Sequence, residues 1–282
     1  MISPKFPDIN FIGNKQKLTS WICDNFPTDV KSVFDAFAGS SSVGYESKKR
    51  GLQVYSNDIM SVNYCISKAL IENKDSILNE SDINIIFTNE KINSGFMQKN
   101  YTDKIFFENE CIELDKYRQN ILSLNSKYKI ALAFALIRRA MIRKMPYSRF
   151  NVPWEQVIKL RDEEYSYAKY KRRRAYHNKS FKEHFIENLE EYSNAIFDNK
   201  QNNVSFNEDI FNLLPKIKAD VIYLDPPYTG TMNNYFGFYG IIDEYINGYK
   251  IKPFENNFIN KQNPFSCLTN YFLVLAIINI GY

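Results

Sequence analysis

Residues 221–228 have the sequence Val-Ile-Tyr-Leu-Asp-Pro-Pro-Tyr, and this stretch decides the expected fold of the 282-residue chain. The apolar run predicts a buried strand, because such strands carry apolar side chains on both faces. The two prolines cannot continue the hydrogen-bond ladder, so the strand is expected to end in a rigid loop. In an open α/β sheet, ligands bind beyond the carboxyl ends of the strands. Asp225 and Tyr228 are therefore candidates for a binding crevice.

The Asp-Pro-Pro-Tyr loop suits methyl transfer to an exocyclic amino group of a nucleobase. Such a nitrogen is a poor nucleophile, because its lone pair is delocalised into the ring, and it needs acceptors for its two hydrogens. The Asp225 carboxylate and the Pro226 carbonyl can be these acceptors, held by the proline backbone angles of Pro226 and Pro227. Tyr228 can stack on a base swung out of the duplex. The plainer interpretation is an ordinary Pro-Pro turn with Asp225 as a solvated acid.

The composition excludes several classes of site. The length allows one large α/β domain or a catalytic domain with a sizeable insert. The cysteines form no Cys-x-x-Cys pair, so we expect reduced thiols in a cytoplasmic protein, with neither zinc ligands nor disulfides. Two histidines are too few for a histidine-based metal cage, and no metal is expected. The first residues lack the apolar segment of a signal peptide, and no membrane association is expected.

Residues 31–58 predict a βαβ unit. Residues 31–37 read as a strand, 38–42 as a tight loop, 43–50 as a short helix and 53–58 as a second strand. Asp58 closes the second strand about 20 residues after the loop, which is the spacing that nucleoside binding requires. Gly39 lets the backbone approach a ligand, and the acid can accept hydrogen bonds from ribose hydroxyls. The chain has no Gly-x-Gly-x-x-Gly and no Gly-Lys-Ser/Thr, which argues against dinucleotide and phosphate-loop sites.

Positive charge is concentrated in residues 127–182. This segment has sixteen Lys and Arg against four Asp and Glu, a local excess of +12. The whole chain is +4, so the remainder sums to −8. The asymmetry predicts a segment that faces a polyanion. Part of it has a plainer explanation, because basic residues near the end of a helix expected over 131–145 complement the helix dipole, and the run 169–177 is also consistent with a solvated helix face.

Three motifs together resemble the Dam-like (D12 class) adenine-N6 DNA methyltransferases. They are the Phe-Asp-Ala-Phe-Ala-Gly-Ser run at 34–40, Asn-Asp-Ile at 57–59 and the motif at 223–228. The resemblance implies a Rossmann-like α/β fold, S-adenosylmethionine as cofactor and double-stranded DNA as substrate. That family places its target-recognition insert between the cofactor half and the Asp-Pro-Pro-Tyr half, and this chain has the same order. We therefore expect a catalytic domain from residues 1–65 and 200–282, and a largely helical insert from 66–199.

The resemblance also implies roles for individual residues. Residues 11–15, Phe-Ile-Gly-Asn-Lys, resemble the family's N-terminal motif, in which an aromatic residue and a lysine border the cofactor; Asn14 departs from the usual glycine. Asp209 matches an acid near the cofactor adenine. The implied catalytic residues are Asp225, Pro226, Pro227 and Tyr228. The implied cofactor-binding residues are Phe11, Lys15, Asp35, Gly39, Asp58, Asp209 and Asp225.

The implied DNA-binding residues lie in the basic segment. Residues 145–153, Met-Pro-Tyr-Ser-Arg-Phe-Asn-Val-Pro, resemble the Arg-x-Phe-Asn-x-Pro stretch of the family's recognition region. The other candidates are basic side chains for phosphate contacts. The full set is Arg138, Arg139, Arg143, Lys144, Arg149, Asn151, Lys171, Arg172, Arg173 and Arg174.

The implied function is site-specific methylation of adenine N6 in duplex DNA by the modification enzyme of a restriction-modification system, with a cognate restriction endonuclease acting on the same site. Two alternatives stay open. A cytosine-N4 or RNA methyltransferase uses the same motif. Family members also usually extend further past the Asp-Pro-Pro-Tyr motif, and the end of this chain is unlike theirs. This predicts a truncated chain, and with it an inactive remnant that binds DNA or cofactor.

Overall fold

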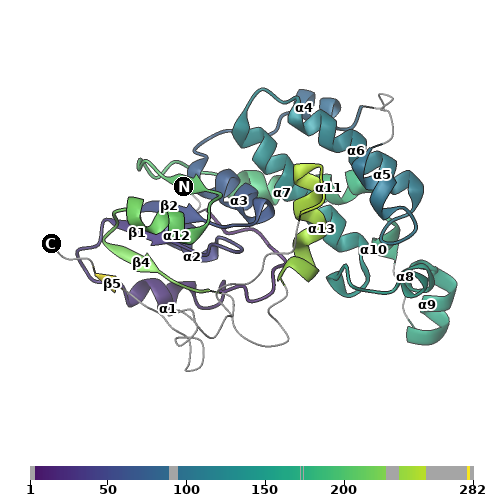
Figure 1. Cartoon of the computed structure of the whole chain (residues 1–282), viewed down its shortest axis with the longest axis horizontal. Helices are drawn as coiled ribbons and strands as arrows, with labels where there is room; N and C mark the ends of the chain where they lie inside the picture. Colours follow the sequence, from purple (N-terminus) through teal and green to yellow (C-terminus); the bar gives the residue numbers. More distant parts are fainter. Residues whose placement is uncertain are drawn as a thin grey trace. The chain divides into compact units, whose positions relative to one another are not determined.

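The computed structural model describes residues 4–88, 95–171, 173, 175–226, 235–251 and 278–279. The chain forms two compact units (Figure 1). The sheet unit comprises residues 1–76, 194–235 and 252–282, and the helical unit comprises residues 77–193 and 236–251. Most of the C-terminal residues on which the expectation of a truncated chain depends, 252–277 and 280–282, lie outside the described residues.

A five-stranded sheet forms the centre of the sheet unit. Its strands are β1 (Ser32–Asp35), β2 (Gln53–Asn57), β3 (Val204–Phe206), β4 (Val221–Tyr223) and β5 (Ile278–Asn279), in the order β3-β2-β1-β4-β5. Strands β1 to β4 are parallel, and β5 runs antiparallel to β4. This confirms the expected α/β class. The strand order reverses between β1 and β4, and ligand crevices of open α/β sheets lie at such a switch point.

The side chains of β1 and β4 alternate between two apolar layers. On one face, Val33 and Val221 pack with residues of α1 (Thr19–Asp24) and α2 (Ser42–Lys49). On the other face, Phe34 and Ile222 pack with α12 (Ile210–Leu213), which precedes the 3₁₀ turn η3 (Leu214–Lys216). Val33, Phe34 and Val221 have no exposed surface, and each such side chain contributes about 1.5–3 kcal/mol of apolar burial. Helices on both faces explain why β1 and β4 carry apolar residues on each face.

The sheet unit extends beyond the expected boundary at residue 65. Helix α3 (Ser61–Ser67) continues into a π-helical turn, η1 (Lys68–Glu72). The buried Lys68 and Glu72 pair at 2.6 Å, and Glu72 accepts a 2.9 Å hydrogen bond from the backbone N–H of Ser205 in β3. The buried Lys48 of α2 also donates to carbonyls of this segment, at 2.9 Å and 2.8 Å. These contacts place residues 66–76 in the sheet unit and correct the expected boundary.

The described part of the helical unit consists of helices. In chain order they are α4 (Glu80–Ile86), α5 (Phe96–Tyr101), α6 (Glu108–Leu122), α7 (Lys127–Lys144), the 3₁₀ turn η2 (Pro146–Ser148), α8 (Trp154–Arg161), α9 (Glu163–Tyr170), α10 (Ala175–Asn178), α11 (Phe181–Asn194) and α13 (Tyr235–Asn247). Helix α7 begins after Ser126, whose hydroxyl accepts a hydrogen bond from the backbone N–H of Tyr128. The side chains from Ala131 to Ile142 are buried, so α7 is the core of this unit.

Helix α13 belongs to the helical unit although it follows β4 in the sequence. The ring of Tyr245 lies edge-on to Phe134 of α7, with centroids 6.1 Å apart. Arg118 of α6 donates to the carbonyls of Ile246 at 3.2 Å and Asn247 at 2.9 Å. This corrects the expectation that residues 200–282 all belong to the catalytic domain, because residues 236–251 pack with the insert.

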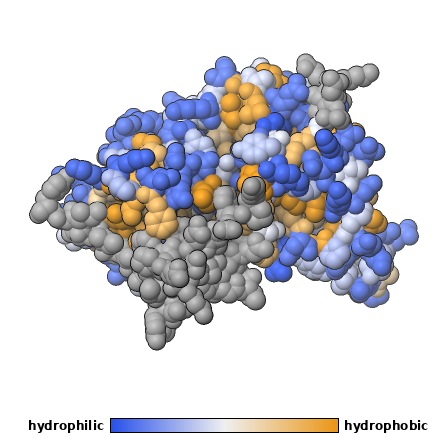
Figure 2. Space-filling view, in the orientation of Figure 1, coloured by the Kyte–Doolittle hydropathy of each residue, from blue (hydrophilic) through white to orange (hydrophobic). Residues whose placement is uncertain are grey.

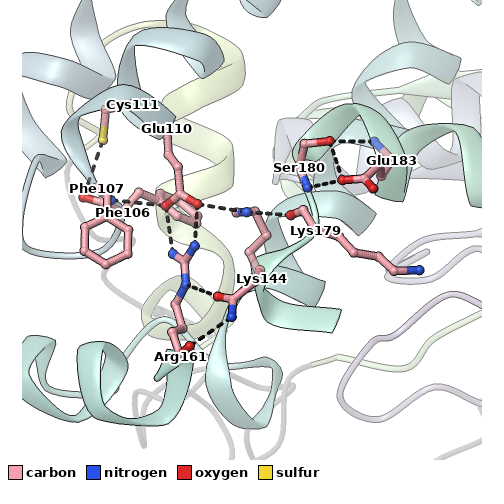
Figure 3. Close-up of polar contacts among 10 residues, drawn as sticks. Phe106, Phe107, Glu110, Cys111, Lys144, Arg161, Lys179, Ser180 and Glu183 are labelled. Carbon is pink, nitrogen blue, oxygen red and sulfur yellow. Dashed lines mark hydrogen bonds and ion pairs between the residues drawn. The ribbon is translucent and has the colours of Figure 1, made fainter. Parts of the chain in front are cut away.

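A buried ionic cluster joins four segments of the helical unit (Figure 3). The Glu110 carboxylate of α6 receives two hydrogen bonds from the Arg161 guanidinium of α8, at 2.6 Å and 2.8 Å. The Lys144 ammonium lies 2.8 Å from Glu110 Oε1 and donates at 2.6 Å to the carbonyl of Lys179. The Glu110 side chain is 7% exposed and also accepts from the backbone N–H of Phe107. Each charge is therefore paired and hydrogen-bonded.

No helix in the described ranges is long and apolar enough to cross a membrane. In the same residues, no group of three or more His, Cys, Asp and Glu side chains is arranged to hold a metal ion. Cys23, Cys65 and Cys111 are free and buried, whereas Cys267 lies outside the described residues.

We predict that Glu110→Ala destabilises the protein by about 3–5 kcal/mol, because it leaves Arg161 and Lys144 buried without their anionic partner. Urea denaturation at neutral pH measures the loss. Glu108→Ala is the matched control, since Glu108 lies in the same helical turn but is exposed, and a change of less than about 1 kcal/mol is expected. Equal losses of unfolding free energy in the two variants would contradict the stabilising role of the Glu110 cluster.

The ionic cluster of Glu110 also predicts how the stability of the protein changes at acid pH. Burial raises the pKa of Glu110, but the hydrogen bonds from Arg161 and the charge of Lys144 outweigh it and hold the pKa below the ordinary 4.5. The stabilisation is therefore complete above pH 4.5 and is lost as the pH falls through the lowered pKa. The Glu110→Ala variant is expected to lose less stability than the wild type over this acid range, as measured by urea titrations at each pH.

Candidate active site

The carboxyl ends of the parallel strands carry the acids predicted from the sequence. Asp35 is the last residue of β1, Asp58 directly follows β2, and Asp225 lies two residues beyond the end of β4. Asp35 pairs in register with Tyr223, so Asp225 lies just past the level of Asp35 on the neighbouring strand. The sheet thus brings Asp35 and Asp225 to the switch point between β1 and β4.

Lys15 and Asp225 form an ion pair across 210 residues of sequence. The Lys15 Nζ lies 2.5 Å from Asp225 Oδ2 and 3.2 Å from the carbonyl of Gly13. Their side chains are only 12% and 19% exposed. Gly13 has a φ of 79°, a conformation that favours glycine, and it forms the turn that precedes Lys15. The N-terminal segment therefore supplies a cation that holds the Asp225 carboxylate in one orientation.

Asp35 is a buried carboxyl with an unused acceptor. Its Oδ2 accepts a 3.2 Å hydrogen bond from the backbone N–H of Gly44 in α2, and its Oδ1 has no hydrogen-bond partner among the described residues. Burial, followed by the nearby charge of Asp225, raises the pKa of Asp35 to about 7. Buried polar atoms in native proteins are nearly always satisfied, so an orphaned carboxylate oxygen suggests a missing ligand donor.

The loop after β1 brings Phe11, Gly39 and Asp58 together. The two Asp58 oxygens accept 2.9 Å hydrogen bonds from the backbone N–H groups of Gly39 and Met60. Gly39 has a φ of 51°, and a Cβ atom there would lie 2.9 Å from a ring carbon of Phe11. Burial raises the pKa of Asp58, and these backbone hydrogen bonds oppose the increase. The Asn63 side chain also donates to this carboxylate, which leaves acceptor capacity for one further donor such as a hydroxyl.

Asn57 is a structural residue that the sequence reasoning did not select. Its side-chain Nδ2 donates to the carbonyls of Ala36 at 3.3 Å and Glu208 at 3.1 Å, and its Oδ1 accepts from the backbone N–H of Glu208 at 3.1 Å. One amide therefore joins the carboxyl ends of β1, β2 and β3. Its place in the Asn-Asp-Ile motif at 57–59 was a signal, but no role was assigned to it.

Asp209 takes part in a helix cap. It is exposed, and its Oδ1 accepts a 2.9 Å hydrogen bond from the backbone N–H of Phe211, the second residue of α12. The helix cap alone therefore explains why position 209 is an aspartate, and no ligand is needed to explain it. Its predicted role near the cofactor adenine remains a prediction.

The burial of three basic residues corrects their expected role in DNA binding. Arg138 is fully buried and lies over the ring of Tyr239, 5.3 Å from its centroid. Arg139 is 7% exposed, and Lys144 belongs to the ionic cluster of Glu110. A phosphate contact requires a side chain that reaches solvent, and these three do not.

The remaining candidates for DNA contact are exposed or outside the described residues. Arg143 is partly exposed and lies 3.7 Å from Glu187. The exposed candidates are Arg149, Asn151, Lys171 and Arg173. The DNA-contact candidates outside the described residues are Arg172 and Arg174, and the catalytic candidates Pro227 and Tyr228 also lie outside them.

The comparisons with known proteins agree with this geometry. Over 261 residues the chain is 58% identical to the Type II methyltransferase M2.HphI of Haemophilus parahaemolyticus. The aligned region covers 93% of this chain and 77% of that protein. It is 27% identical over 244 residues to the Type II methyltransferase M.FokI of Planomicrobium okeanokoites, and 28% identical over 240 residues to the modification methylase StsI of Streptococcus sanguinis. This chain spans 34% of the length of each of these two proteins.

The model of the D12 class N6 adenine-specific DNA methyltransferase family matches residues 11–271. The match includes the N-terminal lysine motif, the loop after β1 and the motif after β4, which are the segments that carry Lys15, Asp35 and Asp225. It confirms the resemblance seen in the sequence. The chain therefore belongs to the D12 class N6 adenine-specific DNA methyltransferases.

Proposed function

We propose that this chain transfers a methyl group from S-adenosylmethionine to N6 of adenine at a specific sequence in double-stranded DNA. The Lys15–Asp225 ion pair at the end of β4 is the observation that carries the proposal, because it fixes an acceptor beside the switch point of the sheet. The relative M2.HphI is a Type II methyltransferase, and we extend that role to this chain as the modification enzyme of a restriction-modification system. Its partner would be a cytoplasmic restriction endonuclease that acts on the same site.

The residues at the strand ends fit the proposed cofactor. S-adenosylmethionine has an ammonium group, ribose hydroxyls and a methyl group activated on a sulfonium. The unpartnered Oδ1 of Asp35 suits the ammonium group. The remaining acceptor capacity of Asp58 suits a ribose hydroxyl, and the small-residue loop at Gly39, covered by Phe11, allows a close backbone approach. The Asp35 carboxylate also adds an opposite charge to a cationic ligand.

Asp225 and the Pro226 carbonyl act on the target amino group. Each would accept one of its hydrogens, which would release the nitrogen lone pair from the ring so that it can attack the methyl group of a bound cofactor. The negative charge of Asp225 stabilises the positive charge that develops on the nitrogen. Lys15 holds the carboxylate in place before the substrate arrives, which lowers the cost of reorganisation in the transition state. Tyr228 is proposed to stack on the extruded adenine.

The exposed basic residues of the helical unit are proposed to bind the DNA backbone. Arg149, Lys171 and Arg173 can reach phosphate oxygens, and Asn151 can donate to a phosphate or a base edge. Such contacts set affinity and register, and they make binding strongly dependent on salt.

We predict that Asp225→Ala lowers methyl transfer by at least about 10³-fold, because it removes both an acceptor and the stabilising charge. Labelled S-adenosylmethionine and unmethylated bacterial DNA, followed by nucleoside analysis, give the measurement. Wild-type label is expected in N6-methyladenine, whereas label in N4-methylcytosine or in RNA would favour the alternative methyltransferases. Cofactor binding by calorimetry is expected to change only a few-fold. Asp24→Ala, at a side chain 63% exposed, is the control and is expected to keep full activity.

Lys15→Met is expected to lower the single-turnover rate of methyl transfer by roughly 10²-fold at saturating DNA and cofactor. Lys15→Arg keeps the charge and is expected to recover much of the rate, because a guanidinium can still pair with Asp225. Rapid-quench measurements compare the two variants with the wild type. Equal rates for Lys15→Met and the wild type would show that the ion pair has no role in the reaction.

Cofactor binding is predicted to release protons near pH 6. The pKa of Asp35 is raised to about 7 by burial, so its carboxyl is mostly protonated below that pH. A cationic ligand favours the ionised form and lowers the pKa, so a proton leaves on binding. Calorimetry in two buffers of different ionisation enthalpy measures this release. It is expected to be a large fraction of one proton near pH 6 and close to zero above about pH 8.5.

Asp35→Asn isolates this effect. The amide cannot ionise, so the variant is expected to bind the cofactor more weakly and to release almost no proton near pH 6. An unchanged proton release in this variant would assign the titration to another group and contradict the contact with Asp35.

A further inference from the structure

A cavity of about 300 Å³ lies in the corner between α8 and α9, and we call it the α8–α9 pocket. Its polar lining comes from both helices: Glu155, Gln156, Lys159, Tyr165, Lys169 and Tyr170. In Figure 2 the surface over these two helices is mostly hydrophilic. A polar ligand therefore fits this pocket better than an apolar peptide.

Two ammonium groups from different helices reach the pocket. Lys159 lies on α8 and Lys169 on α9, and both side chains are exposed. The Lys169 Nζ donates to the Tyr165 hydroxyl at 3.2 Å and lies over the rings of Tyr165 and Tyr170, 5.6 Å and 5.5 Å from their centroids. The ring faces thus already contact an ammonium, which makes them poor platforms for a stacked base. Glu155 is the acid in the lining, so the two lysines leave a net positive charge.

The pocket is built on a fixed corner. Asp162 is the one residue between the two helices, and its Oδ1 accepts a 2.8 Å hydrogen bond from the backbone N–H of Tyr165. The Ser166 hydroxyl donates to the carbonyl of Leu160 at 3.2 Å. Arg161, directly before the corner, is held by both oxygens of Glu110 (Figure 3). A ligand that enters this pocket meets side chains carried by a preorganised backbone.

The donors in the pocket all suit a phosphate group. Lysine ammonium, glutamine amide and tyrosine hydroxyl groups are among the side-chain donors that proteins use on DNA phosphates. The exposed Lys171 and Arg173 follow α9 directly and extend the positive charge along the chain. A single phosphodiester group matches this set, because it offers anionic acceptor oxygens and is small enough for the cavity.

We propose that the α8–α9 pocket binds one backbone phosphate of the DNA substrate, outside the base that is methylated. The contact supplies affinity and register but no sequence discrimination. The proposal rests on the proposed function, since it requires that the chain bind duplex DNA. It adds Lys159 and Lys169, together with the donors beside them, to the DNA-binding residues.

Salt-dependent binding tests the proposal directly. Fluorescence anisotropy is measured for the full chain with a labelled duplex that the wild type methylates and with a duplex that it does not. Lys159→Gln and Lys169→Gln are each expected to weaken binding roughly five- to tenfold near 0.1 M salt, by the same factor for both duplexes. Each variant is also expected to lower the slope of log affinity against log salt concentration by about 1.

Two further variants test the sign and the place of the charge. Glu155→Lys adds a cation to the pocket and is expected to strengthen binding and increase the slope by about 1. Lys104→Gln removes the same charge from an exposed position on the loop after α5 and is expected to leave the slope unchanged. All these positions are exposed, so thermal melts are expected to match the wild type.

The results separate the pocket from the catalytic proposal. Unchanged slopes for Lys159→Gln and Lys169→Gln, or an equal loss for Lys104→Gln, would overturn the phosphate contact. A loss confined to the methylated duplex would also overturn it, because the pocket would then read a base. A wild type that binds DNA with the expected slope changes but forms no N6-methyladenine would leave the pocket assignment intact and refute the proposed function.

Discussion

The parallel pairing of β1 with β4 is the constraint on which the rest of the site depends. The two strands are far apart in the sequence, yet Asp35 lies in register with Tyr223 and Asp225 follows just beyond. Burial raises the pKa of Asp35, and the repulsion from Asp225 on the adjacent strand raises it further. Lys15 reduces this repulsion because its positive charge pairs with Asp225. A cationic ligand beside Asp35 would reduce the repulsion further, which is why an acidic strand edge suits a sulfonium donor.

The helical unit depends on a different kind of contact. Glu110, Lys144 and Arg161 place three charges in its interior, where each would be costly if left alone. Apolar residues of the same size could supply comparable stability, so the cluster does not explain the stability of the unit by itself. Its geometry is the informative part. The bidentate guanidinium fixes the direction in which α8 leaves the core, and thereby the position of the corner that carries Lys159 and Lys169.

The sequence predicted the sheet unit better than the helical unit, for a physical reason. A buried strand followed by two prolines, and an acid about 20 residues after a glycine loop, depend on local backbone geometry, so short motifs reveal them. Burial of a charged side chain depends on partners distant in the chain. Arg138 and Lys144 therefore looked like surface cations, and only the contacts with Tyr239 and Glu110 show that they are internal. The same limit hid the role of Asn57, which was noted only as part of a motif although its amide joins three strand ends.

The two substrates of a DNA methyltransferase make opposite electrostatic demands, and the charge of this chain is divided accordingly. A sulfonium cofactor is cationic and DNA is anionic. The acids at the strand ends, Asp35, Asp58 and Asp225, lie in the sheet unit, whereas the segment with an excess of +12 lies in the helical unit. A uniformly basic protein would bind DNA but repel the cofactor, and a uniformly acidic one would do the reverse. The net charge of +4 is the sum of +12 in residues 127–182 and −8 in the rest of the chain, so the small total conceals a strongly basic segment.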